Sequence, residues 1–527
     1  MNQRETLWAD SRERAAVYSG NTRQPPNTAR RLGSQVAVVL LGNLFTFAVG
    51  LPLQIFVSRV LGAGGLGVYG LLEGGVNTAH GFLNFGLAQT VVRFVPAHLE
   101  NGEYAQARRL VKVSSLLLLV AGALAYAFLL IMLPYLERFW FELRNQVYVV
   151  AVMGLMVPLG LLTFYFQQAL RGLHKIRYMV YGSSIVQLSA KAALTVAAFL
   201  IGLKLSGYVL ATVAASAVGA LWMAYGVKRT LDRLPAGADG DPKPFLSEWR
   251  RYAAYSYAGG LVAAATAYAD RFVLAFVVGS TAVGVLVILR QLQQVPQMFN
   301  QMLLMAGAPM FAAAYARNDS AEREHLYVLM TDWVMKASLA LVLFLIIFAK
   351  PVLTLFGAEF AREGASVLWV FILGQTINLA SGPVGYVALM SGLEAVTFRL
   401  TSINAALSGA LPVILAPAFG LLGIAMTSVA TNAFINISIM LVLRRRFGLR
   451  WWNRRYLGWL LPSCAAGVTG GAVSYSAHDV GVVALAATLI AMYAAFAAVV
   501  FLQGLNDDEK DLLRHFRDRI FHQQTRQ

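Results

Sequence analysis

The chain has 527 residues, of which 58% are hydrophobic and 13% are charged, whereas typical soluble domains carry roughly 25% charged residues. This composition excludes an ordinary soluble protein. A net charge of +17 raises nucleic acid as a partner, but basic residues gathered in short loops that face anionic lipid account for the charge without one. The single cysteine, Cys464, excludes internal disulfides and a cysteine metal cluster.

Fourteen apolar stretches are long enough to cross a bilayer, because a helical span needs about 20 mostly apolar residues. They cover 36–57, 67–91, 111–133, 147–166, 178–203, 207–227, 253–278, 283–306, 327–348, 366–390, 400–416, 420–443, 456–476 and 481–503. The sequence therefore predicts an all-α membrane protein with fourteen transmembrane helices.

Lysine and arginine are distributed unequally between the two sides of these spans. If the N-terminus is cytoplasmic, 33 of the 43 basic residues lie in cytoplasmic segments and six lie in outer segments. Positively charged loops resist translocation, so both termini are expected in the cytoplasm and the protein in the cytoplasmic (inner) membrane. The polar segment 1–33 is expected to be a disordered tail, with no cleavable signal peptide and with the first span as an uncleaved signal anchor.

Two halves of the chain resemble each other at a nearly constant offset. Val60-Leu61-Gly62 and Gly67-Val68 recur as Val277-Val278-Gly279 and Gly284-Val285, and Ala97, Gly172 and Gly207 recur as Ala314, Gly392 and Gly423. Each unit holds six spans, an even number, so the repeats should run parallel around an axis along the membrane normal.

This duplication divides the chain into regions. We expect an N-lobe over 34–230, a cytoplasmic linker over 231–252 and a C-lobe over 253–445, with a central cavity between the lobes. Two extra helices follow over 456–503. The tail 504–527 has an apolar stripe flanked by basic residues, the pattern of a cytoplasmic amphipathic helix lying at the membrane surface.

Seven Asp, Glu, Lys and Arg residues lie well inside the predicted spans. An ionisable group in hydrocarbon costs several kcal/mol and is expected to face a wet cavity or a partner. Four cations against three acids leave a slightly positive interior, which suits a diphosphate, a group that arginine and lysine bind through charge-assisted hydrogen bonds. The seven are Glu73, Lys191, Asp270, Arg271, Arg290, Asp332 and Lys336.

These residues receive separate hypotheses. Arg290, Lys191, Arg271 and Lys336 are candidates for binding a diphosphate in the cavity, and Glu73, Asp270 and Asp332 are candidates for gating or coupling. No metal or cofactor is expected, although H⁺ or Na⁺ is a conceivable coupling ion.

Spacing suggests partners for some of them. Glu73 and Arg290 differ by 217, the repeat offset, so they should face each other across the cleft and pair when its outer mouth is closed. The alternative is that each is satisfied within its own lobe. Asp332 and Lys336 are four residues apart on one helix face and are expected to pair with each other.

The order and spacing of several short motifs resemble those of oligosaccharide flippases of the polysaccharide-transport family, within the multidrug/oligosaccharidyl-lipid/polysaccharide export superfamily. The motifs include Arg59-Val60-Leu61-Gly62 with Gly67-Val68-Tyr69, Phe85-Gly86-Leu87, Gly102-Glu103-Tyr104, Asp270-Arg271-Phe272-Val273-Leu274, Leu355-Phe356-Gly357 and Gly420-Leu421-Leu422-Gly423. Val285-Leu286 departs from the tyrosine that usually follows the second glycine of the repeat.

The resemblance implies two six-helix lobes and export of polyprenyl-diphosphate-linked oligosaccharide for surface polysaccharide. It implies that cavity cations hold the diphosphate, and that the two extra helices form a groove for the polyprenyl tail. The expected partners are that glycan lipid and membrane lipids but no nucleic acid, with the protein acting as a monomer, alone or beside glycan assembly proteins. A peptidoglycan lipid-precursor flippase and a multidrug exporter remain alternatives. A membrane enzyme is disfavoured, because the outer loops are short and hold no phosphate loop or histidine metal motif.

Overall fold

The computed structural model describes residues 28–139, 146–235, 242–317, 319–450, 452–476, 481–504 and 510. These residues form helices and connecting loops and contain no strand. Helices satisfy every backbone polar group within one segment, which hydrocarbon requires because it offers no water. The prediction of an all-α membrane protein is confirmed.

Eleven helices among the described residues are long and apolar enough to cross a membrane. The first of them covers two predicted spans, because α2 consists of two helices joined at Gly62, where φ is 67°. The predicted span 283–306 is divided between α12 and α13, and α20 has only 17 residues. The number fourteen therefore stays a prediction.

The helices of the first half end at Asp232. They are α2 (Thr28–Leu83), α3 (Leu87–Glu100), α4 (Tyr104–Phe139), α5 (Val147–Gly154), α6 (Met156–Gly172), α7 (Ile176–Val180), the π-helix η2 (Tyr181–Gln187), α8 (Leu188–Leu200) and α9 (Leu205–Asp232).

The helices of the second half begin at Pro242. They are α10 (Pro242–Thr266), α11 (Ala269–Val277), α12 (Ser280–Gln294), α13 (Gln297–Ala316), α14 (Ser320–Ile347), α15 (Ala349–Thr354), α16 (Ala358–Ala380), α17 (Val384–Met390), α18 (Glu394–Phe419), α19 (Leu421–Phe447), the 3₁₀ helix η3 (Arg454–Trp459), α20 (Leu460–Ser476) and α21 (Val482–Gln503).

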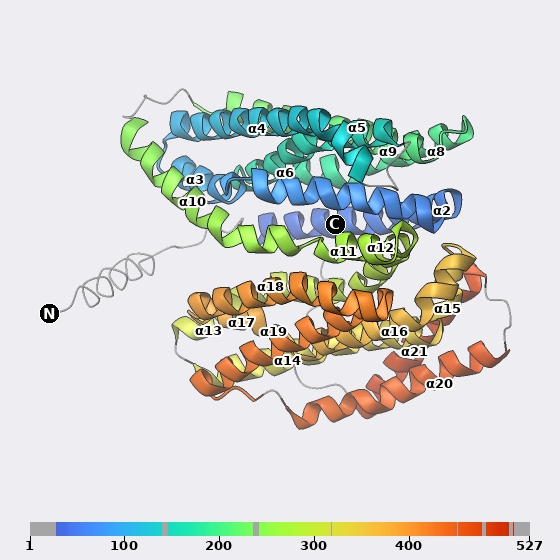
Figure 1. Ribbon diagram of the computed structural model, residues 1–527. Helices are drawn as coiled ribbons and strands as arrows, with labels where there is room; N and C mark the ends of the chain where they lie inside the picture. Colours follow the sequence, from blue (N-terminus) through green and yellow to red (C-terminus); the bar gives the residue numbers. More distant parts are fainter. Residues whose placement is uncertain are drawn as a thin grey trace, which may run out of the picture.

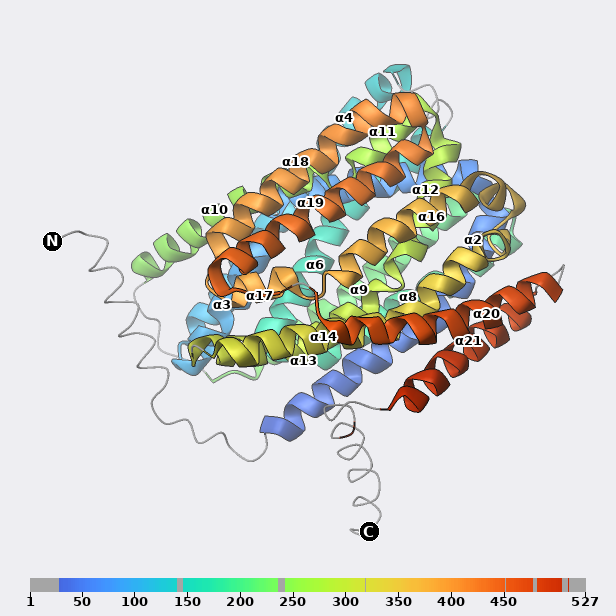
Figure 2. The ribbon, with the colours of Figure 1, turned by 90° about the horizontal axis from the view of Figure 1, so that it is seen from below.

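The two halves of the chain lie on opposite sides of the molecule. Figure 1 shows α2–α9 on one side, α13–α21 on the other, and α10–α12 between them. In Figure 2 the last two helices, α20 and α21, lie side by side at the periphery next to α14. Large apolar side chains such as Leu124 and Leu200 are exposed, as expected for a surface whose solvent is lipid.

A pair of glycines allows α2 and α12 to cross in close contact. A Cβ atom added to Gly67 would lie 1.8 Å from the carbonyl oxygen of Ser280, and one added to Gly284 would lie 1.9 Å from that of Ala63. Both Gly67 with Gly284 and Ala63 with Ser280 differ by 217. The contact is therefore reciprocal between repeat-equivalent residues, which is the relation expected around an internal two-fold axis.

Further contacts join the halves near this crossing. Arg59 donates from Nε to the carbonyl oxygen of Leu355 at 2.7 Å, and the backbone N–H of Ala63 donates to Oε1 of Glu359 at 2.6 Å. The sequence predicts that these residues lie at the outer end of the spans. The halves are thus closed against each other at that end.

Some predicted boundaries differ from the observed ones. α2 begins at Thr28, so residues 28–33 of the predicted disordered tail are helical, and α10 begins at Pro242, inside the predicted linker. The remainder of the N-terminal tail and nearly all of the predicted amphipathic tail 504–527 lie outside the described residues. The lobe limits stay predictions.

Candidate functional site: a polar cavity beside two ion pairs

The seventh predicted span is broken shortly before its two ionisable residues. α10 ends at Thr266, and α11 begins at Ala269. A break inside a span is tolerated where the backbone lines a cavity or is buried in protein, and broken helices supply substrate sites in many transporters. Here the break brings Tyr268, Asp270 and Arg271 to the wall of a polar cavity of about 640 Å³.

The residues that line this cavity all come from the second half of the chain. They lie on α10 through α13, α16, α18 and α19, and most of the polar ones are amides and hydroxyls: Thr266, Gln293, Gln294, Gln297, Gln375, Asn378, Thr401, Asn404, Ser408, Thr427, Ser428, Thr431 and Asn432. The sequence predicts a central cavity between the lobes. This polar cavity lies among the helices of one half, whereas a second, mainly apolar cavity described below is lined by both halves.

Arg290 of α12 lines the cavity and is held on three sides. Its Nη2 donates to Oδ2 of Asp270 at 2.8 Å, and its Nη1 lies 3.3 Å from Oε1 of Gln293 and 3.4 Å from Oγ of Ser428. The guanidinium also lies over the ring of Phe371, 4.9 Å from the centroid. Its side chain is 30% exposed, so part of it remains accessible from the cavity.

Arg271 of α11 reaches across to the first half of the chain. Its Nη1 donates to Oε2 of Glu73 and to the carbonyl oxygen of Gly70, both at 2.9 Å. α2 and α11 lie close together here, since a Cβ added to Gly74 would be in van der Waals contact with Tyr268 and Arg271 at 3.5 and 3.6 Å. The two adjacent residues Asp270 and Arg271 thus take part in two different ion pairs.

The predicted pairing of Glu73 with Arg290 is not observed. Glu73 pairs with Arg271, and Arg290 pairs with Asp270. The repeat offset identifies equivalent positions, but α2 and α12 touch at Gly67 and Gly284. Six residues further along, about 9 Å at 1.5 Å per residue, the partner of α2 at Glu73 is α11.

Buried and partly buried amides connect the helices around the cavity. Oε1 of Gln297 accepts from Nε2 of Gln375 at 2.6 Å and from Nδ2 of Asn378 at 3.0 Å. Asn436 in turn donates to Oδ1 of Asn378 at 3.1 Å. Asn378, Asn404 and Asn432 lie in predicted spans and line the polar cavity together with the glutamines.

Lys191 lies apart from the polar cavity. It lies between two tyrosine rings, with Nζ 4.7 Å from the ring centroid of Tyr208, 5.5 Å from that of Tyr69 and 3.5 Å from the Tyr69 hydroxyl oxygen. The π-helix η2 ends four residues before it, and π-helical segments are frequent near functional sites.

Lys191 instead lines an apolar cavity of about 630 Å³, which we call the α21 cavity. This cavity lies between α2, α12 and α14 and is bounded by Val482, Leu485 and Leu489 of α21. Gln294 lines both the α21 cavity and the polar cavity. The two cavities therefore adjoin at this residue.

Lys336 lines neither cavity. Its Nζ donates to Oδ2 of Asp332 at 3.0 Å, which confirms the predicted pairing on one helix face. Asp332 has no exposed surface and also accepts from Nε1 of Trp459 at 2.7 Å, while Nε of Arg455 lies 3.7 Å away. The structure therefore gives both residues contacts typical of a packed helix interface.

The fold is similar to that of several solved transporter structures. The chain matches an inward-facing multidrug-resistance transporter of the MATE family and MOP superfamily with a TM-score of 0.62 at 17% identity, over 76% of this chain and 94% of that one. It matches the lipid II flippase MurJ in an inward closed conformation with a TM-score of 0.64 at 11% identity, over 88% and 99%. A MOP-superfamily transporter from Pyrococcus furiosus matches with a TM-score of 0.56 at 17% identity, over 79% and 95%. This is the fold of MOP-superfamily transporters.

The family follows from the sequence. Residues 32–315, more than half of the chain, match the model of the family described as polysaccharide biosynthesis protein. The chain belongs to this family, which confirms the resemblance seen in the motifs. No curated protein matches it. The solved structures that it resembles are those of transporters and a flippase, the class that the sequence predicts.

Proposed function

We propose that the protein moves polyprenyl-diphosphate-linked oligosaccharide across the cytoplasmic membrane for surface polysaccharide biosynthesis. The observation that carries this proposal is the pair of arginines, Arg271 and Arg290, at the wall of a polar cavity at membrane depth. Guanidinium groups bind phosphate oxygens in a planar, bidentate geometry. A diphosphate offers more acceptor oxygens than the single carboxylate that each arginine now contacts.

Each arginine already has an acidic partner, and this supports a cycle in which partners exchange. A diphosphate that enters the cavity competes with Asp270 for Arg290 and with Glu73 for Arg271. The released carboxylates can then take a proton or Na⁺. In this scheme Asp270 and Glu73 couple the substrate to an ion, and Lys336 and Asp332 keep a structural role.

The amides and hydroxyls of the cavity wall suit the glycan. Sugars present many hydroxyl groups, and a site built to hydrogen-bond them needs side chains that both donate and accept. Gln297, Gln375 and Asn378 do both, and their mutual hydrogen bonds hold them in place. We place the first sugars along this wall and the tail in the adjoining α21 cavity, where Lys191 lies near the head group.

Closure at the predicted outer end supports a state that receives substrate from the cytoplasmic leaflet. The contacts Arg59–Leu355 and Ala63–Glu359 and the crossing at Gly67 and Gly284 join the halves there. Translocation then requires these contacts to separate while contacts at the other end form. This is alternating access, in which the two halves rock about the site.

Reconstituted proteoliposomes test the proposal. A fluorescent polyprenyl-diphosphate oligosaccharide should change leaflet with wild-type protein and not with Arg290→Ala, while Arg362→Ala, which removes an arginine that is 78% exposed, should behave like wild type. Lipid II and a cationic drug are offered in parallel to separate the alternatives. Translocation that is equal in wild type and Arg290→Ala, or restricted to the drug, would overturn the proposal.

A further inference from the structure

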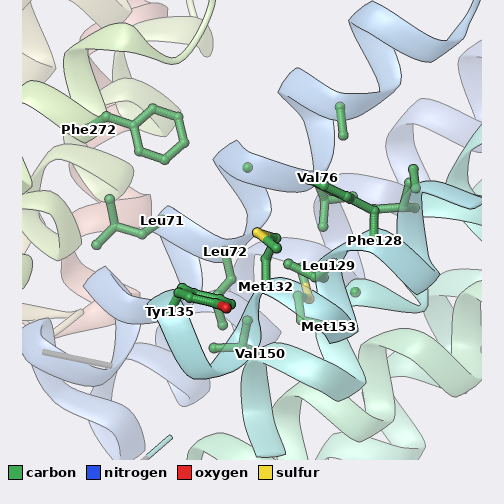
Figure 3. Close-up of a pocket in the computed structure, with 15 residues that line it drawn as sticks. Leu71, Leu72, Val76, Phe128, Leu129, Met132, Tyr135, Val150, Met153 and Phe272 are labelled. Atoms are coloured by element: carbon green, nitrogen blue, oxygen red, sulfur yellow. The ribbon is translucent and has the colours of Figure 1, made fainter. Parts of the chain in front are cut away.

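A second apolar cavity, of about 530 Å³, lies in the first half of the chain between α2, α4, α5 and α6, with Phe272 of α11 on its wall. In Figure 3, Phe272 approaches from the opposite side to Phe128 and Leu129. None of the lining residues is Asp, Glu, Lys, Arg or His. We call it the α4 cavity.

The α4 cavity is the repeat counterpart of the α21 cavity. Residues that line one lie 216 or 217 positions from residues that line the other: Phe272 and Ile55, Gly75 and Leu292, Phe128 and Phe344. The two cavities therefore lie on the two sides of the crossing at Gly67 and Gly284. Both cavities are lined mainly by apolar side chains, although Lys191 lines only the α21 cavity.

The two cavities differ in what covers them. Val482, Leu485 and Leu489 of α21 close the side of the α21 cavity. No described helix takes the equivalent place beside α4, where Phe128 is 63% exposed and Tyr135 is 56% exposed. Phe128 lies within the predicted span 111–133, so we expect lipid hydrocarbon to cover this position.

The α4 cavity also adjoins the polar cavity through a single turn of α11. Arg271 lines the polar cavity, and the next residue, Phe272, lines the α4 cavity. On α2, Gly74 packs against Arg271 while Gly75 lines the α4 cavity. The contact between α2 and α11 is therefore the wall between a site for anions and a site for hydrocarbon, which matches a ligand with a charged head and a long tail.

From this arrangement we propose that the α4 cavity binds the isoprenoid chain of the lipid-linked substrate while its diphosphate lies at Arg271 and Arg290. The inference rests on the proposed function. It gives the substrate a second tail site on the side of the crossing away from α21. An ordinary phospholipid would place its head group at the membrane surface, whereas this cavity lies beside Arg271 at the depth of the ion pairs.

Two open glycines of α2, one on each side of the kink at Gly62, allow each cavity to be filled separately. A Cβ at Gly75 would meet only the ring of Phe272, at 4.0 Å, and a Cβ at Gly50, which lines the α21 cavity, would meet nothing within 4 Å. Gly75→Leu and Gly50→Leu should therefore fill their cavities without displacing backbone. Gly471→Leu on α20 is the matched control, because Gly471 also has open space and lines neither cavity.

The probe is an undecaprenyl diphosphate that carries a photoreactive diazirine near the end of its chain. Full-length protein in phosphatidylethanolamine–phosphatidylglycerol nanodiscs is cross-linked with it and mapped by mass spectrometry. We expect adducts on α4 near Phe128 and Met132, a severalfold loss of these adducts in Gly75→Leu, and no loss in Gly471→Leu or Gly50→Leu. Unlabelled undecaprenyl diphosphate should reduce the number of α4 adducts, whereas additional phospholipid should leave it unchanged.

Two results would overturn the inference. Adducts confined to α21, or α4 adducts that excess phospholipid removes, would show that the substrate chain does not occupy the α4 cavity. Binding of geranyl diphosphate, whose chain is too short to reach far into either cavity, tests the proposed function separately. If that binding persists and depends on Arg290, the proposed function survives a failure at α4; if wild type binds no diphosphate, both proposals fall.

Discussion

Arg271 and Glu73 form an ion pair between the two halves of the chain, with Nη1 2.9 Å from Oε2. Arg271 is the neighbour of Asp270, which holds Arg290 at 2.8 Å. Both ion pairs share one turn of α11, so we expect that breaking one of them disturbs the other. If an anion binds in the second half as proposed, this turn links its binding to the contact with the first half.

The Arg271–Glu73 pair should tolerate exchange of its charges. Arg271→Ala or Glu73→Ala alone leaves a partly buried charge without its partner, which costs about 1–3 kcal/mol, so we expect a several-fold to 100-fold loss of transport. Combining Glu73→Arg with Arg271→Glu should restore the ion pair between the halves and with it part of the Tm lost in the single variants. Transport should stay low, because a carboxylate then lines the cavity where the diphosphate is proposed to bind. The measurements are thermal unfolding in detergent and translocation of the fluorescent glycan lipid in proteoliposomes at equal protein content.

The control for this exchange is the pair that the repeat offset predicts. Glu73→Arg combined with Arg290→Glu should recover nothing, because Glu73 contacts Arg271 and not Arg290. Recovery in this second double variant, with none in the first, would contradict the observed pairing.

Arg290→Ala should abolish surface glycan in cells at normal protein level. The substitution removes charge-assisted hydrogen bonds worth about 1.5–3 kcal/mol each and leaves Asp270 without its partner. Surface glycan is measured by gel and antibody staining, and protein level by immunoblot of membranes. Arg362→Ala should leave the glycan unchanged, since that side chain is 78% exposed; normal glycan in Arg290→Ala cells would count against the site.

Gly67→Ala should favour opening at the outer end. The added Cβ would lie 1.8 Å from the carbonyl oxygen of Ser280, so the backbones of α2 and α12 must separate. Spin labels at the exposed outer positions Lys204 and Arg362, read by double electron–electron resonance, should report a longer distance than in wild type. A Cβ at Gly50, on the other side of the Gly62 kink in α2, would meet no atom within 4 Å, so Gly50→Ala should leave the distances unchanged. Identical distance distributions in the two variants would argue that this helix crossing does not close the outer end.

Asp332→Ala should lower stability rather than substrate affinity. Asp332 has no exposed surface and holds Lys336 and Trp459, and removing one partner of a buried pair costs about 3–5 kcal/mol. Thermal unfolding in detergent should show a clear decrease in Tm, whereas the protein that remains folded should bind the glycan lipid as wild type does. Weaker binding of the glycan lipid at an unchanged Tm would instead indicate that Asp332 and Lys336 belong to the binding site.

The main charged residues of the site can be predicted from the sequence. An ionisable residue inside an apolar span is costly unless it has a partner or faces a wet cavity. Asp270, Arg271 and Arg290 were found in this way, and all three line the polar cavity. The same reasoning also selected Lys336 and Lys191. This reasoning does not distinguish the residues that line the polar cavity from Lys336, which is in a packed ion pair, or from Lys191, which lies between tyrosine rings. All of them are simply ionisable residues within apolar stretches of the sequence.

Other parts of the site leave little trace in the sequence. The break between α10 and α11 falls at Ala267 and Tyr268, with no proline or glycine to mark it. Gln297 and Gln375 lie 78 residues apart and hydrogen-bond only because the fold brings α13 and α16 together. The predicted pairing of Glu73 with Arg290 was wrong for a related reason: an offset between repeats identifies equivalent residues and does not say which neighbour each one meets.

The most direct test of the account is equilibrium binding of undecaprenyl-diphosphate oligosaccharide to purified protein in nanodiscs, for wild type and for Arg290→Ala. The account predicts saturable binding that free diphosphate competes away and that weakens by about 10–100-fold in the variant, the equivalent of about 1.4–2.8 kcal/mol. Equal affinity in the two proteins, or binding that diphosphate does not disturb, would contradict a diphosphate site at Arg271 and Arg290.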